Sequence, residues 1–496
     1  MPTTTISSRS TIALFWGAGG AIGKIAGQLL VQITLARILD PESFGQFVVL
    51  LSVLSLGSVL ADCGFGAALI QKKEIGSNDV SLALGWSLIA SIVIALVINS
   101  LAPFLAHQFG DESLELMFSI SAFLIIPHSV GNLSTNLLQR ELQMKIIQII
   151  HLFSYIVCFG GVSTTLALMG WGGWSLIIGY AIQATFKVIA TYSVSRHTLI
   201  PRLWGDRALI KFGFKSLGND LANWSMDNLD RFVIGKFWGL YPLGLYSVAF
   251  NLSKAPVGMM LYAVQNIAFA SSARLQENPL AIKRGFQVVM AATALTTLPL
   301  FTIIALESPV ILNIIYGEKW IMAAPYMTAL AASIPLISLG SVAAAILRGA
   351  GAIGTEFRIQ LVTAFVFFFG LLFLRNLSLD VAIWNIPLAY LIRLILFLMV
   401  AKKLLLLKTL EILLPLRGAV FLATTGVLVT ALAHIFHFTS TKFMGVLPLL
   451  AGCCALALLF ISKFRWCMDS SLLAIIRLKF AQGRLATIIA WLDRSK

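Results

Sequence analysis

Long apolar segments recur along the whole 496-residue chain and restrict it to folds that a lipid bilayer can surround. One of them, SLALGWSLIASIVIALVINSLAPFLA (81–106), carries no charged residue. A helix needs about 20 mainly apolar residues to cross a membrane. Only 11% of the residues are charged and the mean hydropathy is +0.91, which leaves too little polar surface for a soluble protein of this length. The chain is therefore expected to be a polytopic membrane protein.

We expect these segments to be α-helices. The strands of a membrane barrel are short and alternate apolar with polar residues, whereas the runs in this chain do not alternate. The sequence predicts about fourteen transmembrane helices, at 11–37, 44–70, 80–106, 113–137, 146–169, 173–195, 208–236, 243–271, 281–306, 321–347, 357–375, 380–401, 412–436 and 443–463.

Basic residues are concentrated on alternate connecting segments. If the N-terminus is cytoplasmic, most of the 36 Lys and Arg residues lie on inside-facing segments. The outside-facing segments and helix ends keep Arg37, Lys236, Lys319, Arg375 and Lys442. An excess of Lys and Arg in cytoplasmic loops is the usual asymmetry of membrane proteins, so both termini are predicted to be cytoplasmic. The net charge of +15 follows mainly from this topology and does not indicate a nucleic-acid partner.

The chain contains an internal repeat. LARILDPESFGQF (35–47) aligns without a gap on IGKFWGLYPLGLY (234–246), so that Gly45 matches Gly244. The first and seventh helices are therefore expected to be equivalent. Because each repeat then has six helices, both repeats point the same way across the membrane. The predicted parts are an N-lobe at 1–200, a C-lobe at 201–410, two more helices within 411–464 and a cytoplasmic amphipathic tail at 465–496.

Polar side chains form a stripe on the first helix and again on the seventh. Lys24, Gln28 and Gln32 are spaced four residues apart, which places them on one helical face. An ionised group at membrane depth costs roughly 2.5–3.5 kcal/mol and usually faces a bundle interior or a water-filled cavity. The repeat maps this face onto a stripe that contains Asp220, Asn223, Asp227, Asp230 and Arg231.

Two interpretations of the stripes stay open. One is a water-filled cavity between the two lobes. The other is an ion pair between Asp227 and Arg231, four residues apart, that stabilises helix packing. Beside the first stripe, Gly19, Gly23 and Gly27 recur every four residues, which predicts a close helix–helix contact.

Further ionisable residues fall within the predicted spans, among them Lys187, Lys254 and Arg393. Three roles are open for Asp62 in the second helix: it pairs with Lys24, it serves as a proton or cation site, or it lies near the inner interface. Such groups are the candidates for substrate binding and ion coupling in a membrane protein.

Metal and enzyme chemistry is not indicated by the sequence. The five cysteines lack the spacing of a metal site, and His128 and His151 are interpreted as structural residues. The connecting segments are too short for a catalytic domain, and no P-loop, dinucleotide-binding fingerprint or H-E-x-x-H motif is present. We therefore predict no enzymatic activity, no cofactor and no metal.

Five stretches resemble one family of membrane proteins: LARILDPESFGQF, ALIQKKE, LLQRELQMK, NLDRFVIGKFWGLYPLGLYSVAFNLSKAP and YGEKW. The chain resembles the polysaccharide transporter family of the multidrug/oligosaccharidyl-lipid/polysaccharide exporter superfamily, and in particular exporters for lipopolysaccharide, colanic acid or teichuronic acid. The five stretches are spread over the first ten predicted helices, so the likeness covers most of the chain.

The resemblance implies two six-helix lobes around a central cavity, plus two C-terminal helices, in a bacterial inner membrane. It implies that the protein flips polyprenyl-pyrophosphate-linked oligosaccharide repeat units by alternating access, driven by an H+ or Na+ gradient, for O-antigen, capsule or exopolysaccharide synthesis. Membrane lipids and the polymerase and glycosyltransferases of the same assembly are the implied partners.

The resemblance also implies a cationic cavity for the anionic carrier. The residues that fit substrate binding there are Lys24, Gln28, Gln32, Lys187, Asn223, Arg231, Lys254 and Arg393. The candidates for ion coupling are Asp62, Asp220, Asp227 and Asp230. These acids partly cancel the positive charge, so a multidrug or cation antiporter of the same fold is an alternative. A membrane-embedded glycan polymerase and a non-transporting scaffold are the others.

Overall fold

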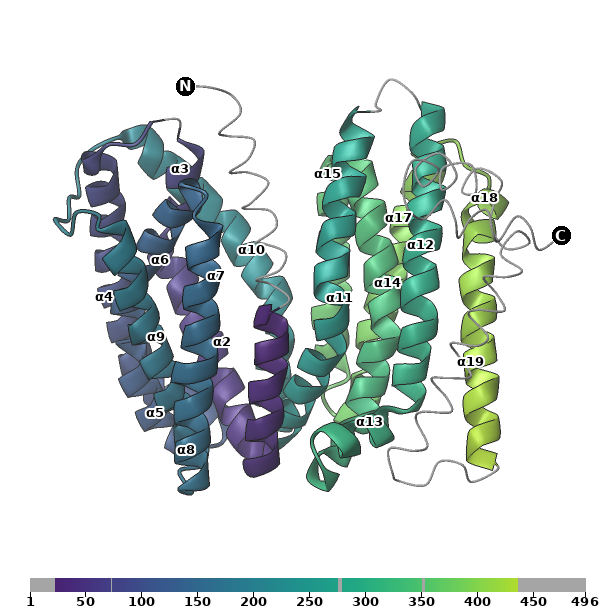
Figure 1. Ribbon diagram of the computed structural model, residues 1–496, viewed down its shortest axis with the longest axis horizontal. Coiled ribbons are helices and arrows are strands. Elements are labelled where there is room, and N and C mark those ends of the chain that lie inside the picture. The colour runs from purple at the N-terminus through teal and green to yellow at the C-terminus, as the bar shows by residue number, and fades with distance from the viewer. Residues whose placement is uncertain (1–22, 73, 275–278, 350–352, 436–496) are drawn as a thin grey trace. The chain divides into compact units, whose positions relative to one another are not determined.

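The structure, a computed structural model, describes residues 23–72, 74–274, 279–349 and 353–435, and every regular element in these ranges is a helix (Figure 1). The helices form two compact units. The first contains residues up to Val248 together with Arg375–Leu379, and the second contains the remainder from Ala249 onward. The predicted fourteenth span and the predicted tail at 465–496 lie outside the described residues.

The helices of the first unit follow one another with short connections. They are residues 23–38, α2 (Pro41–Asp62), α3 (Phe65–Gln71), α4 (Ser77–Phe109), α5 (Ser113–Ala122), α6 (Ile125–Arg140), α7 (Met144–Phe153), the π-helical η1 (Ser154–Gly161), α8 (Val162–Leu168), α9 (Gly173–Ser195) and α10 (Arg207–Trp238). Within this unit α2 packs against α4 and α10, while α6 packs against α4 and α9.

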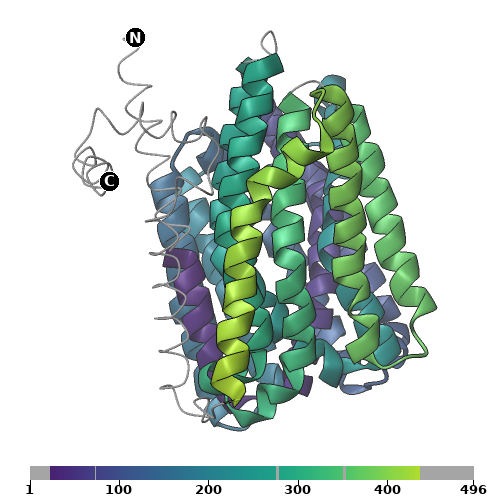
Figure 2. The same ribbon diagram turned by 90° about the vertical axis from the view of Figure 1, so that its right-hand side faces the viewer.

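The second unit is built from α12, α14 and α17, with α19 beside α12 and α15 beside α17 (Figure 2). Its core is apolar and includes Phe286, Met290 and Phe397. The helices are α11 (Leu240–Arg274), which begins in the first unit, α12 (Pro279–Leu306), α13 (Ser308–Ile315), η2 (Glu318–Ala323), α14 (Ala324–Gly349), α15 (Ile353–Phe373), α16 (Leu379–Ala382), α17 (Asn385–Leu404), α18 (Thr409–Leu413), η3 (Leu414–Leu416) and α19 (Arg417–Ile435).

Nine helical segments of the described residues are long and apolar enough to cross a membrane. The number rises to ten if the bent pair α5–α6, with an angle of 46°, forms one span. The nine are Pro41–Asp62, Ser77–Phe109, Met144–Leu168, Gly173–Ser195, Leu280–Leu306, Glu318–Gly349, Gly354–Phe373, Leu379–Leu404 and Thr409–Ala431. The predicted all-helical polytopic class is thus confirmed, whereas fourteen spans in two parallel lobes stay a prediction.

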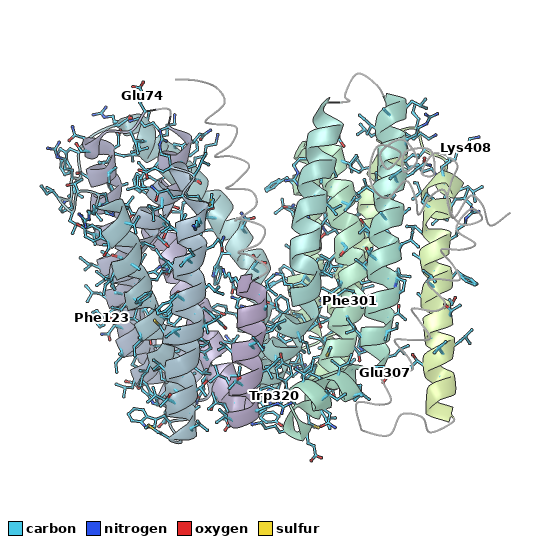
Figure 3. The ribbon with its side chains drawn as sticks, viewed as in Figure 1. Glu74, Phe123, Phe301, Glu307, Trp320 and Lys408 are labelled. Carbon is cyan, nitrogen blue, oxygen red and sulfur yellow. The ribbon has the colours of Figure 1, made fainter. Side chains whose placement is uncertain are left out.

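The side chains are distributed as a bilayer requires. On α4 the buried face carries small residues such as Ser91, Ala95 and Ala102, which allow neighbouring helices to approach closely. The opposite face exposes large apolar residues, which lipid can cover. Figure 3 shows Phe123 on the outside of the first unit, whereas Phe301 is fully buried in the second.

Helix α10 is long enough to span a membrane but is more polar than the nine apolar segments, because it carries the predicted polar stripe. Asp206 caps its N-terminus by accepting hydrogen bonds from the backbone N–H groups of Ala208 and Leu209. The helix packs against α2 and α3, so the seventh predicted span belongs to the first compact unit. The lobe boundaries at residues 200 and 410 stay a prediction.

The two glycines matched by the repeat make reciprocal close contacts. A Cβ on Gly45 would lie 2.0 Å from the carbonyl oxygen of Leu240, and a Cβ on Gly244 would lie 1.7 Å from that of Pro41. Pro41 and Leu240 are themselves matched in the repeat. A contact in which equivalent residues exchange places is what a local twofold relation produces. The start of α2 and the start of α11 therefore cross through a pair of glycines.

We expect Gly45→Ala and Gly244→Ala each to destabilise the protein, because the new methyl group meets backbone rather than a movable side chain. Overpacking of this kind costs about 1–3 kcal/mol. Melting of the purified protein in detergent measures the effect. Gly218→Ala on α10, where nothing lies within 4 Å of the added atom, is the matched control and should melt no lower than wild type, since alanine favours a helix over glycine. Equal melting of all four proteins would contradict the crossing.

Candidate functional site

Four basic side chains from four helices gather in the first unit. Lys24 of the helix at 23–38 and Lys187 of α9 interact electrostatically with each other. Both ammonium groups also interact electrostatically with the ring of His151 in α7. Lys187 also acts on His128 of α6. We call these four residues the cationic cluster. The structure thus brings together two of the predicted substrate-binding residues, Lys24 and Lys187.

Glycines set the distance between the helices that carry this cluster. A Cβ on Gly27 would lie 2.9 Å from the Cδ1 atom of Ile156, and a Cβ on Gly23 would lie 3.9 Å from a methyl group of Leu152. The helix at 23–38 therefore approaches α7 and η1 closely on the glycine face next to Lys24. This confirms the close packing predicted at Gly27, whereas Gly23 makes an ordinary contact and Gly19 lies outside the described residues. The π-helical η1 begins three residues after His151, and such bulges are frequent at functional sites.

The cationic cluster has no acidic partner in the part of the chain that the structure describes. No ion pair or hydrogen bond there involves the ammonium group of Lys24 or of Lys187. The Nε2 atom of His151 is buried and has no hydrogen-bond partner among the same residues. Two like charges in a membrane interior are unfavourable without a counter-ion. The arrangement is suited to bind an anion.

The amide residues of the first stripe lie farther along the same helix. Gln28 and Gln32 are both half-buried. The Nε2 atom of Gln32 is buried and has no hydrogen-bond partner within the described ranges. An amide group in this state has a donor available for a hydroxyl group of a ligand.

The stripe on α10 divides into an exposed part and a buried part. Asn223 and Asp227 are exposed, whereas Asp230 is buried. The hydroxyl group of Tyr246 in α11 donates a hydrogen bond to Asp230 at 2.5 Å, and the backbone N–H of Arg231 donates to the same carboxylate at 2.9 Å. Asp230 thereby joins α10 to α11, and this contact stabilises the packing of the two helices. Its role in ion coupling stays a prediction.

Asp62 ends α2, where the second predicted span is interrupted. Cys63 and Gly64 have left-handed backbone conformations, with φ of 49° and 70°, and α3 then begins at Phe65. The carboxylate of Asp62 accepts a hydrogen bond from the backbone N–H of Gly66 at 3.2 Å and interacts electrostatically with Asp220 of α10. No ion pair joins Asp62 to Lys24 in the described part of the chain, and no three residues there form a metal-binding group.

Two predicted substrate-binding residues lie in the second unit. The guanidinium group of Arg393 in α17 lies 5.5 Å from the ring centre of Phe397 and interacts electrostatically with the buried Glu356 of α15. Glu356 also pairs with Arg348 at 3.0 Å, so two arginines share one carboxylate. The ammonium group of Lys254 in α11 lies over the ring of Phe250 at 5.0 Å.

The profile of a family described as polysaccharide biosynthesis protein matches residues 34–325, which is more than half of the chain. The chain belongs to this family. The match includes Lys187, His151 and His128 of the cationic cluster and begins ten residues after Lys24. The resemblance that the sequence indicated is therefore confirmed.

Curated relatives show the same relationship. The succinoglycan biosynthesis transport protein ExoT of Rhizobium meliloti (strain 1021) is 27% identical over 357 residues, which cover 70% of this chain and 71% of ExoT. The lipopolysaccharide biosynthesis protein WzxC of Escherichia coli (strain K12) is 24% identical over 69% of this chain and 70% of WzxC. The teichuronic acid biosynthesis protein TuaB of Bacillus subtilis (strain 168) is 26% identical over 55% and 57%. This family member is a multi-pass membrane transporter involved in polysaccharide biosynthesis.

Solved structures show the fold. The lipid II flippase MurJ in an inward closed conformation superposes with a TM-score of 0.71 at 14% identity, over 92% of this chain and 98% of MurJ. An inward-facing multidrug transporter of the MATE family reaches 0.55 at 16% identity, over 77% of this chain and 95% of that structure. At these identities the likeness concerns the arrangement of helices, not the ligand.

A polar network that the sequence did not reveal stands at one end of the first unit. The ammonium group of Lys72 lies 2.8 Å from Asp206 and 2.7 Å from Asp79, so it joins α3, α4 and α10. The guanidinium group of Arg140 donates to the carbonyl oxygens of Leu69 and Lys72 at the end of α3. The hydrogen bond from Lys72 and the N–H of Ala208 lower the pKa of Asp206, and the two carboxylates raise the pKa of Lys72.

The bond between Lys72 and Asp206 is expected to make stability depend on pH in the acidic range. Because the folded pKa of Asp206 lies below its unfolded value, its contribution is present above the unfolded pKa of about 3.9 and is lost as the pH falls through the folded pKa. Asp206→Asn keeps a residue that can cap α10. This variant should melt at a lower temperature than wild type at pH 7. Once Asp206 of wild type is protonated as well, the two proteins should melt at the same temperature.

Melting curves of both proteins between pH 7 and pH 3 measure this difference. Glu112→Gln, which removes an exposed carboxylate, is the control and should follow wild type at every pH. A difference between Asp206→Asn and wild type that persists unchanged at the lowest pH would show that the ion pair is not its cause.

Proposed function

We propose that this transporter flips polyprenyl-pyrophosphate-linked oligosaccharide repeat units from the inner to the outer leaflet of a bacterial inner membrane during the synthesis of a surface polysaccharide. The observation that carries the proposal is the cationic cluster, in which Lys24, Lys187 and His151 lie together without an acidic partner in the described residues. The family membership and the relatives named for succinoglycan, lipopolysaccharide and teichuronic acid biosynthesis support it.

The chemistry of such a substrate fits this arrangement. A pyrophosphate group that leaves water needs fixed positive charge and hydrogen-bond donors, and ammonium groups bind phosphate oxygens strongly. Lys24 and Lys187 supply the charge, and the Nε2 atom of His151 adds a ring nitrogen that donates a hydrogen bond when it carries the proton. The half-buried Gln28 and Gln32 and the exposed Asn223 offer amide groups to the sugar hydroxyls. The lipid tail can remain in the bilayer while the head group crosses.

We further propose that the protein has fourteen transmembrane helices, in two parallel six-helix lobes followed by two C-terminal helices, with both termini in the cytoplasm. The reciprocal contact of Gly45 and Gly244 supports equivalent halves. Arg231, Lys254 and Arg393 are proposed to bind the substrate as well. Polysaccharide polymerase and glycosyltransferases of the same assembly are the proposed partners that produce and consume the substrate.

Coupling to an H+ or Na+ gradient is proposed to use Asp62 and Asp220, together with Asp227. Two carboxylates that interact at a broken helix repel each other unless a proton or a cation lies between them. This pair also favours a second candidate, a cation antiporter of the same fold. The cationic cluster favours an anionic substrate, and for that reason the flippase is the preferred function.

Deletion of the gene in its host should leave completed lipid-linked repeat units on the cytoplasmic leaflet, and wild type should clear them. Lys24→Ala and Lys187→Ala are each expected to reduce clearance roughly 10- to 100-fold, the equivalent of the 1.5–3 kcal/mol of one hydrogen bond to a charged group. Lys24→Arg should retain most activity. Extraction of labelled lipid-linked sugars from membranes with equal protein levels gives the readout.

Lys211→Ala, which removes an exposed lysine of α10, is the control for that experiment and should clear the units like wild type. Clearance by Lys24→Ala and Lys187→Ala at the wild-type rate would exclude a charge-binding role for the cluster. If the units are already translocated in the deletion strain but are no longer joined into polymer, the protein is a polymerase instead.

Asp62→Asn is expected to make transport independent of the driving gradient, because an amide cannot take up a proton or pair with a cation. Proteoliposomes with an imposed pH or Na+ gradient measure the gradient-driven part of uptake. Wild type should respond to one of the two gradients, and Asp62→Asn to neither, while substrate binding is kept. A full gradient response in Asp62→Asn would remove Asp62 from the coupling site.

A further inference from the structure

The segment that connects α9 to α10, residues 196–206, is fastened along the first turns of α4. The backbone N–H of Arg202 donates to the carbonyl oxygen of Ser81 at 2.9 Å, and its guanidinium group donates to Asn78 at 2.7 Å. The indole N–H of Trp86 donates to the carbonyl oxygen of Leu203 at 3.2 Å. We call residues 196–206 the strap.

A glycine of α4 makes room for the strap. A Cβ on Gly85 would lie 2.1 Å from the carbonyl oxygen of Arg202, so the strap approaches the helix backbone too closely for any side chain. At its C-terminal end Asp206 is held by Lys72. These contacts fix the strap along one edge of the first unit, where Figure 1 shows it as the teal loop beside the start of α4.

The strap nevertheless exposes large apolar side chains. Trp204 is 80% exposed and Ile200 is 70% exposed, and Leu199 is also exposed. Contiguous exposed apolar groups usually mark an interaction site. Exposed basic residues lie near them in the sequence: Arg196, Arg202, Arg207 and Lys211.

The position of the strap indicates what covers these side chains. It follows directly on the transmembrane segment that ends at Ser195 and lies beside the first turns of the one that begins at Ser77. A segment at the ends of two spans lies at the level of the lipid headgroups, where tryptophan is enriched and arginine pairs with anionic lipid. We propose that the strap is a binding surface for anionic phospholipids, in which Trp204 and Ile200 enter the boundary of the acyl chains and Arg196 and Arg202 bind headgroup phosphates.

The opposite end of the same unit provides an internal control. Trp171, between α8 and α9, is 52% exposed and has exposed apolar neighbours in Leu168 and Met169, but no basic residue lies in the connection 169–172. Both tryptophans have access to a membrane interface. Of the two connections, only that of Trp204 contains basic residues, so only its surface should distinguish anionic from zwitterionic lipid.

The test uses the full-length protein in nanodiscs of phosphatidylcholine alone and with one third phosphatidylglycerol. We expect the anionic lipid to raise the melting temperature of wild type. The rise should be largely lost in the double variant Arg196→Gln/Arg202→Gln and reduced in Trp204→Ser. Trp171→Ser should keep it in full. High salt should weaken the effect of the anionic lipid, because it screens exposed charges.

Native mass spectrometry of the same proteins counts the bound phosphatidylglycerol molecules directly and is independent of melting. Loss of at least one bound lipid in the double variant, but not in Trp171→Ser, would support the strap as the site. An equal response of wild type and the double variant to anionic lipid in both measurements would overturn the proposal. The outcome does not depend on which substrate is transported.

Discussion

Positive charge inside a membrane protein needs a counter-ion, and this requirement connects the main features of the structure. Lys24 and Lys187 lie close enough to interact, and the described residues offer them no carboxylate. At Gly27 the helix of Lys24 packs closely against α7 and η1, and these in turn pack against α9, which carries Lys187, so the fold keeps the two like charges near each other. An arrangement that is unfavourable without a ligand and favourable with an anion is what binding of a pyrophosphate requires.

The repeat explains the close crossing of α2 and α11. Gly45 and Gly244 occupy equivalent positions and each approaches the backbone of the other repeat, so the crossing of α2 and α11 needs a missing side chain on both sides. Around this crossing Asp230 accepts a hydrogen bond from Tyr246 and fixes α10 to α11. The polar helix α10 is thereby anchored in the first unit although much of its surface is unsuited to lipid.

The sequence predicted those features that depend on local pattern. Apolar length indicated the helices, the four-residue spacing placed Lys24 beside the glycine face, and ordered motifs indicated the family. Features that depend on contacts between residues far apart in the sequence could not be predicted. A lone histidine carries no local signal, so the sequence indicates only a structural role for His151; the fold brings the helix at 23–38 and α9 against α7 and η1, and both lysines then interact electrostatically with its ring. Lys72 and Asp206 are far apart in sequence and meet only in the folded chain. The interruption at Cys63 and Gly64 is hidden within a continuous apolar run.

Binding of the carrier pyrophosphate to the cationic cluster during translocation is the step that we propose the function depends on. Its most direct measurement is flipping by the purified protein in proteoliposomes, followed as the exposure of a labelled polyprenyl-pyrophosphate-linked repeat unit to a reagent that cannot cross the bilayer. We expect wild type to expose the label, and we expect the double variant Lys24→Gln/Lys187→Gln, folded and reconstituted to the same level, not to expose it. Equal rates for the two proteins, or no exposure by wild type under either an H+ or a Na+ gradient, would contradict it.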